Sequence, residues 1–334
     1  MTVERAIYYQ RYIGLSADDK PLPLDDTNFS LMPGAEFFET DTWNLYTWTG
    51  DAWVLTGSQG IKIFDTQSSV YKGLQFNAEA PQVCSQSYLY AIAEGDISGH
   101  SNFSKYGRIT TITTSVGDVW SLGGTYVWQS SAGEGLRVIS SSCEDCSTGK
   151  GAQKIKIIAL NTGYDSTTWE ITMNGTNPVV VGSTALCRIN RVYVSQSGTN
   201  YAASANIDIY STGSTTPTFA RIEQGLLQGR RSMYTVPSGK TLYITSMRVS
   251  AGVGGTATKL EYCTFTLKAS VNSEGTLSPS MFYPKAEVGV LNGSIELDFE
   301  APEKIQATAD VKISVFGDSA QGAAGTVALR GWIE

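Results

Sequence analysis

The sequence contains few charged residues and only one histidine. Asp, Glu, Lys and Arg together make up 16% of its 334 residues, whereas about a quarter is usual. Long solvated helices need such residues along their outer faces, but β-sandwiches can cover their surfaces with Ser, Thr, Asn and Gly turns. The chain also has 34 glycines. This composition predicts a mainly β protein, and the length favours more than one compact module.

Basic surface and long apolar runs are also scarce. The formal charge is -7, whereas duplex DNA and anionic membranes attract basic proteins. We therefore expect neither nucleic acid nor membrane as a partner. The stretch MTVERAIYYQRYIGL places Glu4, Arg5 and Arg11 where a secretory signal needs an uninterrupted apolar core, and the later apolar runs stop well short of the roughly 20 residues that span a bilayer. We expect a protein made in the cytoplasm of its host, without a signal peptide.

Histidine-dependent chemistry could use only His100, which lies in the glycine-containing segment SGHSNF. Paired-histidine metal sites are excluded by count, and the patterns GxSxG, HExxH and the EF-hand loop are absent. The segment STGKGA lacks both the first glycine and the final Ser or Thr of a phosphate-binding loop. We predict no enzyme, and no catalytic, cofactor-binding or metal-binding residues. A glycosidase pair of carboxylates from distant strands leaves no local signature and stays open.

Of the five cysteines, only Cys143 and Cys146 have a suggestive spacing, in SSSCEDCSTGKG. A structural zinc site needs four ligands, usually from a second such pair, and no second pair exists. We interpret the segment as a loop with reduced thiols. A local disulfide or a lone metal site is the alternative.

The stretch EFFETDTWNLYTWTGDAWVL, residues 36–55, contains Trp43, Trp48 and Trp53. Its short runs have aromatic residues at alternate or nearly alternate positions and are separated by the turns DTWN and TGD, a pattern typical of a β-meander. Large rings suit the small interior of a three-stranded unit. We interpret the tryptophans as core residues. A platform that stacks on sugar rings is the alternative.

Residues 85–108 contain the one helical segment, in which Tyr88, Ala91 and Ile92 share a face and Gly95 ends the helix. From about residue 108 onward, short strand patterns follow one another at a spacing typical of a sandwich or jelly roll. The predicted fold is a small aromatic N-terminal β-meander, one short helix and two β-sandwich, jelly-roll-like modules. The expected division is an arm and meander over residues 1–75, a helical linker over 76–108, a first sandwich over 109–215 and a second over 216–334.

The segments GHSNFSKYGR and VGDVWSLGGTYVW resemble a family of tailed-bacteriophage virion proteins. That family carries Gly-His-Ser, then Lys-Phe-Gly-Arg, then Val-Trp and Gly-Gly-x-Tyr before a β-rich body; here Tyr106 replaces the usual phenylalanine. The strand order of the body and the aromatic opening stretch are similar as well. The matching positions are Gly99, His100, Ser101, Lys105, Tyr106, Gly107, Arg108, Val119, Trp120, Gly123, Gly124 and Tyr126.

The resemblance implies a virion structural protein without catalytic residues. We expect a capsid decoration or head-fibre protein that binds the particle through its N-terminal region, with the major capsid protein or tail and neck proteins as partners. Symmetric copies supply stabilising interface, and a homotrimer is favoured. The alternatives are a tail-associated fibre or adhesin that binds host glycan, and a depolymerase. The interaction candidates are Trp43, Trp48 and Trp53, together with Arg230 and Arg231, a pair that is more often salt-bridged or solvated than a phosphate clamp.

Overall fold

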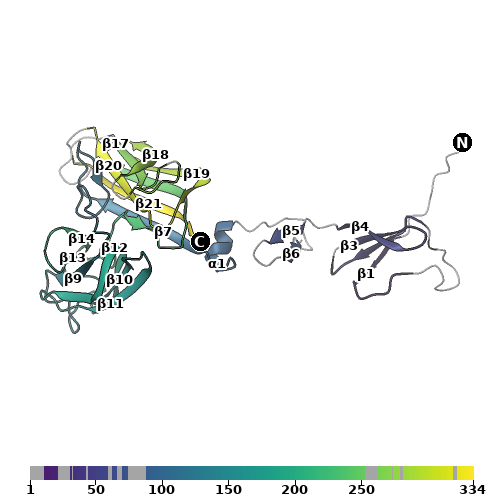
Figure 1. Ribbon diagram of the computed structural model, residues 1–334, viewed down its shortest axis with the longest axis horizontal. Coiled ribbons are helices and arrows are strands. Elements are labelled where there is room, and N and C mark those ends of the chain that lie inside the picture. Colours follow the sequence, from purple (N-terminus) through teal and green to yellow (C-terminus); the bar gives the residue numbers. More distant parts are fainter. Residues whose placement is uncertain are drawn as a thin grey trace. The chain divides into compact units, whose positions relative to one another are not determined.

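The computed structural model shows two compact units, residues 1–87 and residues 88–334. The fold is mainly β, as predicted, and the described residues contain one short helix (Figure 1). The structure describes residues 11–21, 31, 33–42, 44–58, 62–65, 70–73, 88–252, 262–272, 274–278, 281–318 and 322–334. For residues 57, 58, 62–65, 70–73, 183 and 184 this description covers the backbone alone.

The first unit contains a four-stranded sheet in the order β1-β2-β3-β4. Strands β2 to β4 are the predicted meander, and β1 adds to it in parallel with β2. Strand β1 could not be predicted from the sequence, because a four-residue strand whose partner is distant along the chain leaves no local pattern. A separate hairpin pairs β5 with β6. The strands are β1 (Arg11–Gly14), β2 (Glu36–Glu39), β3 (Asn44–Trp48), β4 (Trp53–Ser58), β5 (Lys62–Asp65) and β6 (Val70–Gly73).

The second unit begins with the predicted helix, α1 (Tyr88–Glu94). Ile92 on its inner face is 3% exposed, and the Tyr88 ring packs edge-on against Trp332, with the ring centroids 5.2 Å apart. The helix ends at Gly95, which has a positive φ of 83°. Such a left-handed residue is a common way to end a helix, and glycine adopts it without strain. The expected helix end is therefore confirmed.

The C-terminal part of the chain forms a β-sandwich of two sheets. One sheet has the order β15-β20-β17-β18, with β8 also paired to β20, and the other has the order β19-β16-β21-β7. Their facing sides enclose a large apolar core that includes Phe265, Leu267 and Ile313. The strands are β7 (Ser101–Ile109), β8 (Gly117–Asp118), β15 (Tyr234–Thr235), β16 (Leu242–Gly252), β17 (Cys263–Ala269), β18 (Tyr283–Val290), β19 (Gly293–Ile305), β20 (Asp310–Gly317) and β21 (Ala324–Ile333).

The other β module is one six-stranded sheet that folds over its own core, in the order β11-β10-β12-β9-β13-β14. The long strand β12 pairs with β9 through its first part and with β10 through its later part. Between them, Gly182 has a positive φ of 58°, and a Cβ there would lie 2.5 Å from the Trp169 ring. Glycine therefore permits this corner. The strands are β9 (Glu134–Ser140), β10 (Ala152–Asn161), β11 (Ser166–Thr172), β12 (Val179–Ser197), β13 (Ile207–Ser211) and β14 (Thr218–Ile222).

The strand pairing differs from the division that we expected from the sequence. Residues 76–108 were expected to be a linker, but β7 (Ser101–Ile109) pairs with β21 along its whole length. Strand β8 pairs with β20, and β14 lies beyond the expected boundary at residue 215. The six-stranded module is thus inserted between β8 and β15 of the C-terminal sandwich. A local pattern can identify a strand, but it cannot identify a partner that lies at the other end of the domain.

Buried polar side chains join the two β modules. Arg188 of β12 forms two hydrogen bonds of 2.8 Å with the carboxylate of Asp310 in β20. Asn190 of β12 exchanges hydrogen bonds with the backbone of Thr235 in β15. Lys105 of β7, which is 7% exposed, donates to the carbonyl of Asn190. Buried groups of this kind need matched partners, so these contacts fix how the two modules fit together.

Candidate interaction surfaces

One face of the first unit's sheet is a closed aromatic core. Trp48 is 3% exposed, and its ring centroid lies 5.6 Å from that of Trp53. The Trp53 ring also contacts Tyr12 and Phe37 edge-on, while its Nε1 donates a 2.7 Å hydrogen bond to the carbonyl of Pro21. Trp48 is thus buried and Trp53 is partly buried among these rings, whereas sugar stacking needs an open ring face. Trp43 lies outside the described residues.

Lys20 and Pro21 lie against this aromatic face. Lys20 Nζ lies 4.2 Å from the centroid of the Tyr46 ring and 2.7 Å from a carboxylate oxygen of Glu39. Burial raises the pKa of Glu39, but hydrogen bonds from Lys20, Thr42 and Asn44 outweigh that effect and leave the pKa below its usual value. Glu39 therefore stays ionised and holds Lys20 across the rings. Leu55, which pairs with Tyr46 on this face, is still 54% exposed.

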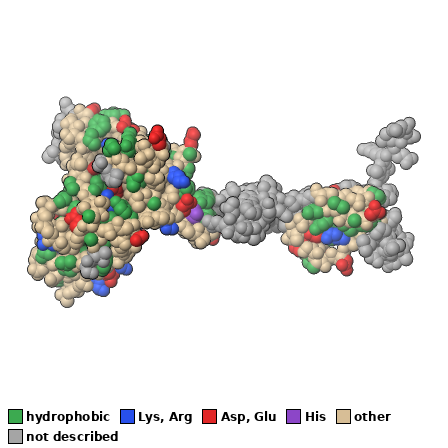
Figure 2. Space-filling view, viewed as in Figure 1, with side chains coloured by type: hydrophobic (Ala, Val, Ile, Leu, Met, Phe, Trp, Pro, Cys, Tyr) green, Lys and Arg blue, Asp and Glu red, His purple; other side chains and the backbone are tan. Residues whose placement is uncertain are grey.

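The opposite face of this sheet, which we call the open face, carries Ile13, Phe38, Leu45 and Val54. Ile13 pairs with Phe38, and Phe38 pairs with Leu45; directly paired residues project from the same side of a sheet. Ile13 is 67% exposed and Val54 is 46% exposed. Figure 2 shows apolar side chains gathered on the surface of this unit. Exposed apolar side chains that cluster on one side are typical of a surface that binds another protein.

Arg230 and Arg231 are adjacent in sequence but bind different partners. Arg230 forms an ion pair with Glu223 at 2.6 Å. Arg231 is 3% exposed, and it donates hydrogen bonds to the carbonyl of Phe219 and to the hydroxyl of Tyr126. Its guanidinium carbon also lies 4.9 Å from the centroid of the Tyr126 ring. Arg231 is thus part of the interior between the β modules, and the two arginines do not act as one clamp.

Arg230 also lines a groove on the outer face of the sheet β19-β16-β21-β7, which we call the basic groove. The volume of the basic groove is ≈ 490 Å³. Sequence reasoning identified Arg230 but missed Arg108 and Arg248, because these come from strands far apart in the chain. The lining residues are Tyr106, Gly107, Arg108, Arg230, Arg248, Val249, Ser250, Ser294, Thr326, Val327 and Ala328.

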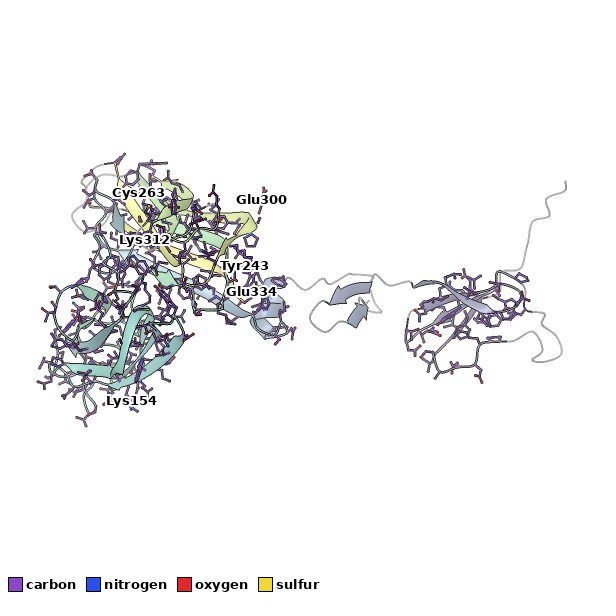
Figure 3. All side chains as sticks on the ribbon, viewed as in Figure 1. Lys154, Tyr243, Cys263, Glu300, Lys312 and Glu334 are labelled. Atoms are coloured by element: carbon purple, nitrogen blue, oxygen red, sulfur yellow. The ribbon has the colours of Figure 1, made fainter. Side chains whose placement is uncertain are left out.

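His100 links α1 to the end of β21. Its Nε2 lies 3.3 Å from a carboxylate oxygen of Glu334, and its ring packs edge-on against Tyr88. The other carboxylate oxygen of Glu334 accepts a 2.9 Å hydrogen bond from the hydroxyl of Tyr243 (Figure 3). These contacts give the histidine a structural role. The groups in contact with His100 are the Glu334 carboxylate, the Tyr88 ring and a backbone carbonyl. None of these is a hydroxyl or thiol nucleophile that the imidazole could activate as a base.

The described part of the chain contains no group of three or more His, Cys, Asp or Glu residues that could hold a metal ion. The thiols of Cys143 and Cys146 are both free, and Cys143 is exposed. Asp145, between them, is fully buried and accepts hydrogen bonds from Ser140 and from several backbone amides. The turn is therefore held by this carboxylate. No helix among the described residues has the length and apolar character to cross a membrane.

Comparison with known proteins gives only weak matches. No protein-family model matches the chain, and no curated protein matches its sequence. The structure of infectious bursal disease virus strain Gx is 11% identical, covering 70% of this chain and 76% of that chain, with a TM-score of 0.17. A crystal structure of the VP2 subviral particle of the same virus is 9% identical over 70% of this chain and 75% of that chain, with a TM-score of 0.16. Superpositions with TM-scores this low do not identify a shared fold.

Proposed function

We propose that this chain is a non-enzymatic structural component of a tailed-phage virion. In this proposal it is a capsid decoration or head-fibre protein that binds the particle through its N-terminal region. The sequence resemblance supports a phage origin. In the structure, the residues that carry the resemblance are packing and turn residues. Trp120 packs edge-on against Tyr126 with the ring centroids 5.1 Å apart, and its Nε1 donates to the carbonyl of Gly123. Gly123 and Gly124 both have positive φ.

The open face of the first unit is the observation that supports attachment most directly. Lys20 and Pro21 lie against the aromatic face of the same sheet and leave Leu55 exposed at its edge, whereas on the open face Ile13 and Val54 are both more than two-fifths exposed. Burying such side chains against another protein contributes roughly 1.5–3 kcal/mol each. The major capsid protein is the proposed partner, and a tail or neck protein is the alternative.

A binding assay with particles that lack this protein tests the attachment. The full chain carrying Ile13→Glu and Val54→Glu should sediment with the particles at least about tenfold less well than the wild type, because each glutamate must be desolvated on binding. Ala52→Glu is the matched control, since Ala52 is exposed in the turn between β3 and β4. Equal binding of the double variant and the control would contradict the proposal that the open face binds the particle.

The body of the protein supports a scaffold role. Its two β modules are joined by buried, hydrogen-bonded side chains such as Arg188 and Asp310. These contacts hold the two modules of the second unit in a fixed arrangement. We propose a homotrimer, because repeated copies of one sandwich supply stabilising interface. Light scattering of the purified chain measures this directly, and a monomeric mass at micromolar concentration would contradict it.

A tail-associated fibre or adhesin is the second candidate, and the basic groove favours it because a groove lined by arginine, tyrosine and hydroxyl side chains is suited to binding a polar ligand. The number of copies per particle separates the two candidates. A decoration protein should be present in numbers comparable with the major capsid protein, whereas a tail part should be far less abundant. Quantitative densitometry of purified virions measures this ratio.

A further inference from the structure

The basic groove has Tyr106 and Arg108 along one side, Arg248 on the other and short side chains between them. Ala328 of β21 pairs with Tyr106 of β7 on one side and with Arg248 of β16 on the other. Thr326 of β21 pairs with Arg108 on one side and with Ser250 on the other, so Arg108 and Arg248 are offset by two residues along the strands. Neighbouring strands are about 4.8 Å apart, so the two sides stand roughly 10 Å apart. The short side chains of β21 form the floor of the groove.

Two arginines of the groove form no ion pair among the described residues, although Glu296 of β19 lies opposite Arg248 in the strand register. Within the part of the chain that the structure describes, neither Arg108 nor Arg248 forms an ion pair, and Arg248 Nε donates only to the hydroxyl of Ser294, at 3.1 Å. Arg230 differs, because Glu223 neutralises it at 2.6 Å. The groove therefore retains local positive charge on a chain whose net charge is -7.

We infer that the basic groove binds an acidic saccharide whose carboxylate or phosphate lies between Arg108 and Arg248. Guanidinium groups bind these anions through paired, charge-assisted hydrogen bonds. Tyr106 is 43% exposed and offers a ring on which a sugar ring can pack. The hydroxyls of Ser250 and Thr326, which lie 2.6 Å apart, can exchange hydrogen bonds with sugar hydroxyls. The width of the groove also suits a single sugar chain.

The surroundings of the groove disfavour a long polyanion such as a nucleic acid. Glu296 is paired in register with Arg248, and Asp298 follows on the same face of β19. Glu223 lies at the other end, beside Arg230. A strand of closely spaced phosphates would pass these carboxylates and be repelled by them. A saccharide with one acidic group per repeat places a single charge between the arginines and leaves its neutral parts beside the carboxylates.

Titration calorimetry with the purified full chain tests the inference. The probes are an oligosaccharide that contains glucuronate, a sugar-substituted glycerol phosphate oligomer, a neutral oligosaccharide of equal length and a single-stranded oligonucleotide. At least one acidic saccharide should bind at least about tenfold more tightly than the neutral one. The carboxylate and phosphate probes show which acid is recognised.

Variants assign the binding to the groove. R108Q/R248Q removes the two charges, and A328L fills the floor without changing any charge; each should weaken binding about tenfold or more. R330Q is the matched control, because Arg330 lies on the same strand and the same face but lines a different cleft. R330Q should bind as the wild type does, and circular dichroism verifies that each variant is folded.

Several results would overturn the inference. These are no binding of either acidic saccharide, equal binding of the neutral one, unchanged affinity of folded R108Q/R248Q, or tighter binding of the oligonucleotide. The site lies in the second unit and the assay uses the chain in solution. The outcome is therefore independent of the particle-binding assay that tests attachment through the open face.

Discussion

Arg188 and Asp310 form a two-point ion pair between the β modules, with side chains only 5% and 3% exposed. The carboxylate of Asp310 also accepts a hydrogen bond from the hydroxyl of Thr235. The Arg188 guanidinium donates further bonds to the carbonyls of Gln129 and Cys187. Each charge is thus matched within the protein, and removal of one partner leaves the other buried without compensation.

We predict that Arg188→Met lowers the free energy of unfolding by about 3–5 kcal/mol, because Asp310 then remains as an unpaired buried charge. Replacing both residues, as Arg188→Met with Asp310→Asn, should recover part of that loss. Chemical denaturation followed by tryptophan fluorescence measures the difference.

Arg221 and Asp208 provide the matched comparison for this pair. Their ion pair is also two-point, at 2.6 and 2.7 Å, but the side chains are 24% and 21% exposed. Arg221→Met should therefore cost only about 1 kcal/mol or less. Equal effects of the two single variants would show that burial of the Arg188 pair does not determine its importance.

Lys105 gives the unfolding free energy a pH dependence at alkaline pH. Burial lowers the pKa of Lys105 well below its usual value of 10.5, and the positive charges of Arg231 and Arg191 lower it further. As the pH falls below 10.5, the unfolded chain takes up a proton at this lysine while the folded chain resists it. The contribution of Lys105 to stability is therefore largest above pH 10.5 and decreases as the pH falls towards the folded pKa.

The variant Lys105→Met isolates this effect, since it keeps a similar volume but cannot titrate. The difference in unfolding free energy between wild type and variant should shift in favour of the wild type as the pH rises from neutral to 10.5. Denaturant titrations at several pH values measure it. A difference that does not change with pH would show that Lys105 has an ordinary pKa in the folded protein.

Gly182 is predicted to be intolerant of a side chain. Gly182→Ala should lower the free energy of unfolding by at least about 1–2 kcal/mol, from the left-handed backbone alone, and the contact with Trp169 adds to this. Gly213→Ala is the control, because a Cβ there would approach only the Ser211 hydroxyl, at 3.9 Å. The melting temperatures of the two variants provide the comparison. An unchanged melting temperature for Gly182→Ala would contradict the left-handed backbone at Gly182 in β12.

The cysteines should differ sharply in reactivity. Cys143 is exposed, whereas Cys187 is fully buried, donates to the carbonyl of Asn161 and has a pKa that burial raises. Alkylation of the native protein should modify Cys143 rapidly and Cys187 only after unfolding, because the thiolate is the reactive form. Peptide mass spectrometry identifies the modified sites. Rapid native labelling of Cys187 would contradict the packing of β12.

The strands and the helix could be predicted from the sequence because their patterns are local. In β19, the segment SIELDFE alternates apolar and acidic residues, and Leu297 and Phe299 pack against the core. Ile295 has the same alternation but is 42% exposed, and it lies on an edge strand of its sheet. The segments PVVV and CRINRVYV have the local pattern of two short strands, and the structure joins them in β12 through Gly182.

The partners of these strands could not be predicted in the same way. Pairing of β7 with β21 joins opposite ends of the second unit, and no pattern within either strand specifies the other. The basic groove could not be predicted for the same reason. Arg108 and Arg248 come from distant strands, and they line one groove only because β7 and β16 both pair with β21. Lys105 carries no signal of its burial either, since an alternating strand pattern normally places lysine in solvent.

The position of the chain on the particle tests the central claim most directly. Cryo-electron microscopy of the virion, with this chain labelled at its C-terminal end, would locate both units. Our proposal predicts density for the first unit against the capsid surface, with the open face around Ile13 and Val54 covered by the major capsid protein. Density for this chain at a tail tip, or contact with the capsid through the second unit instead, would contradict it.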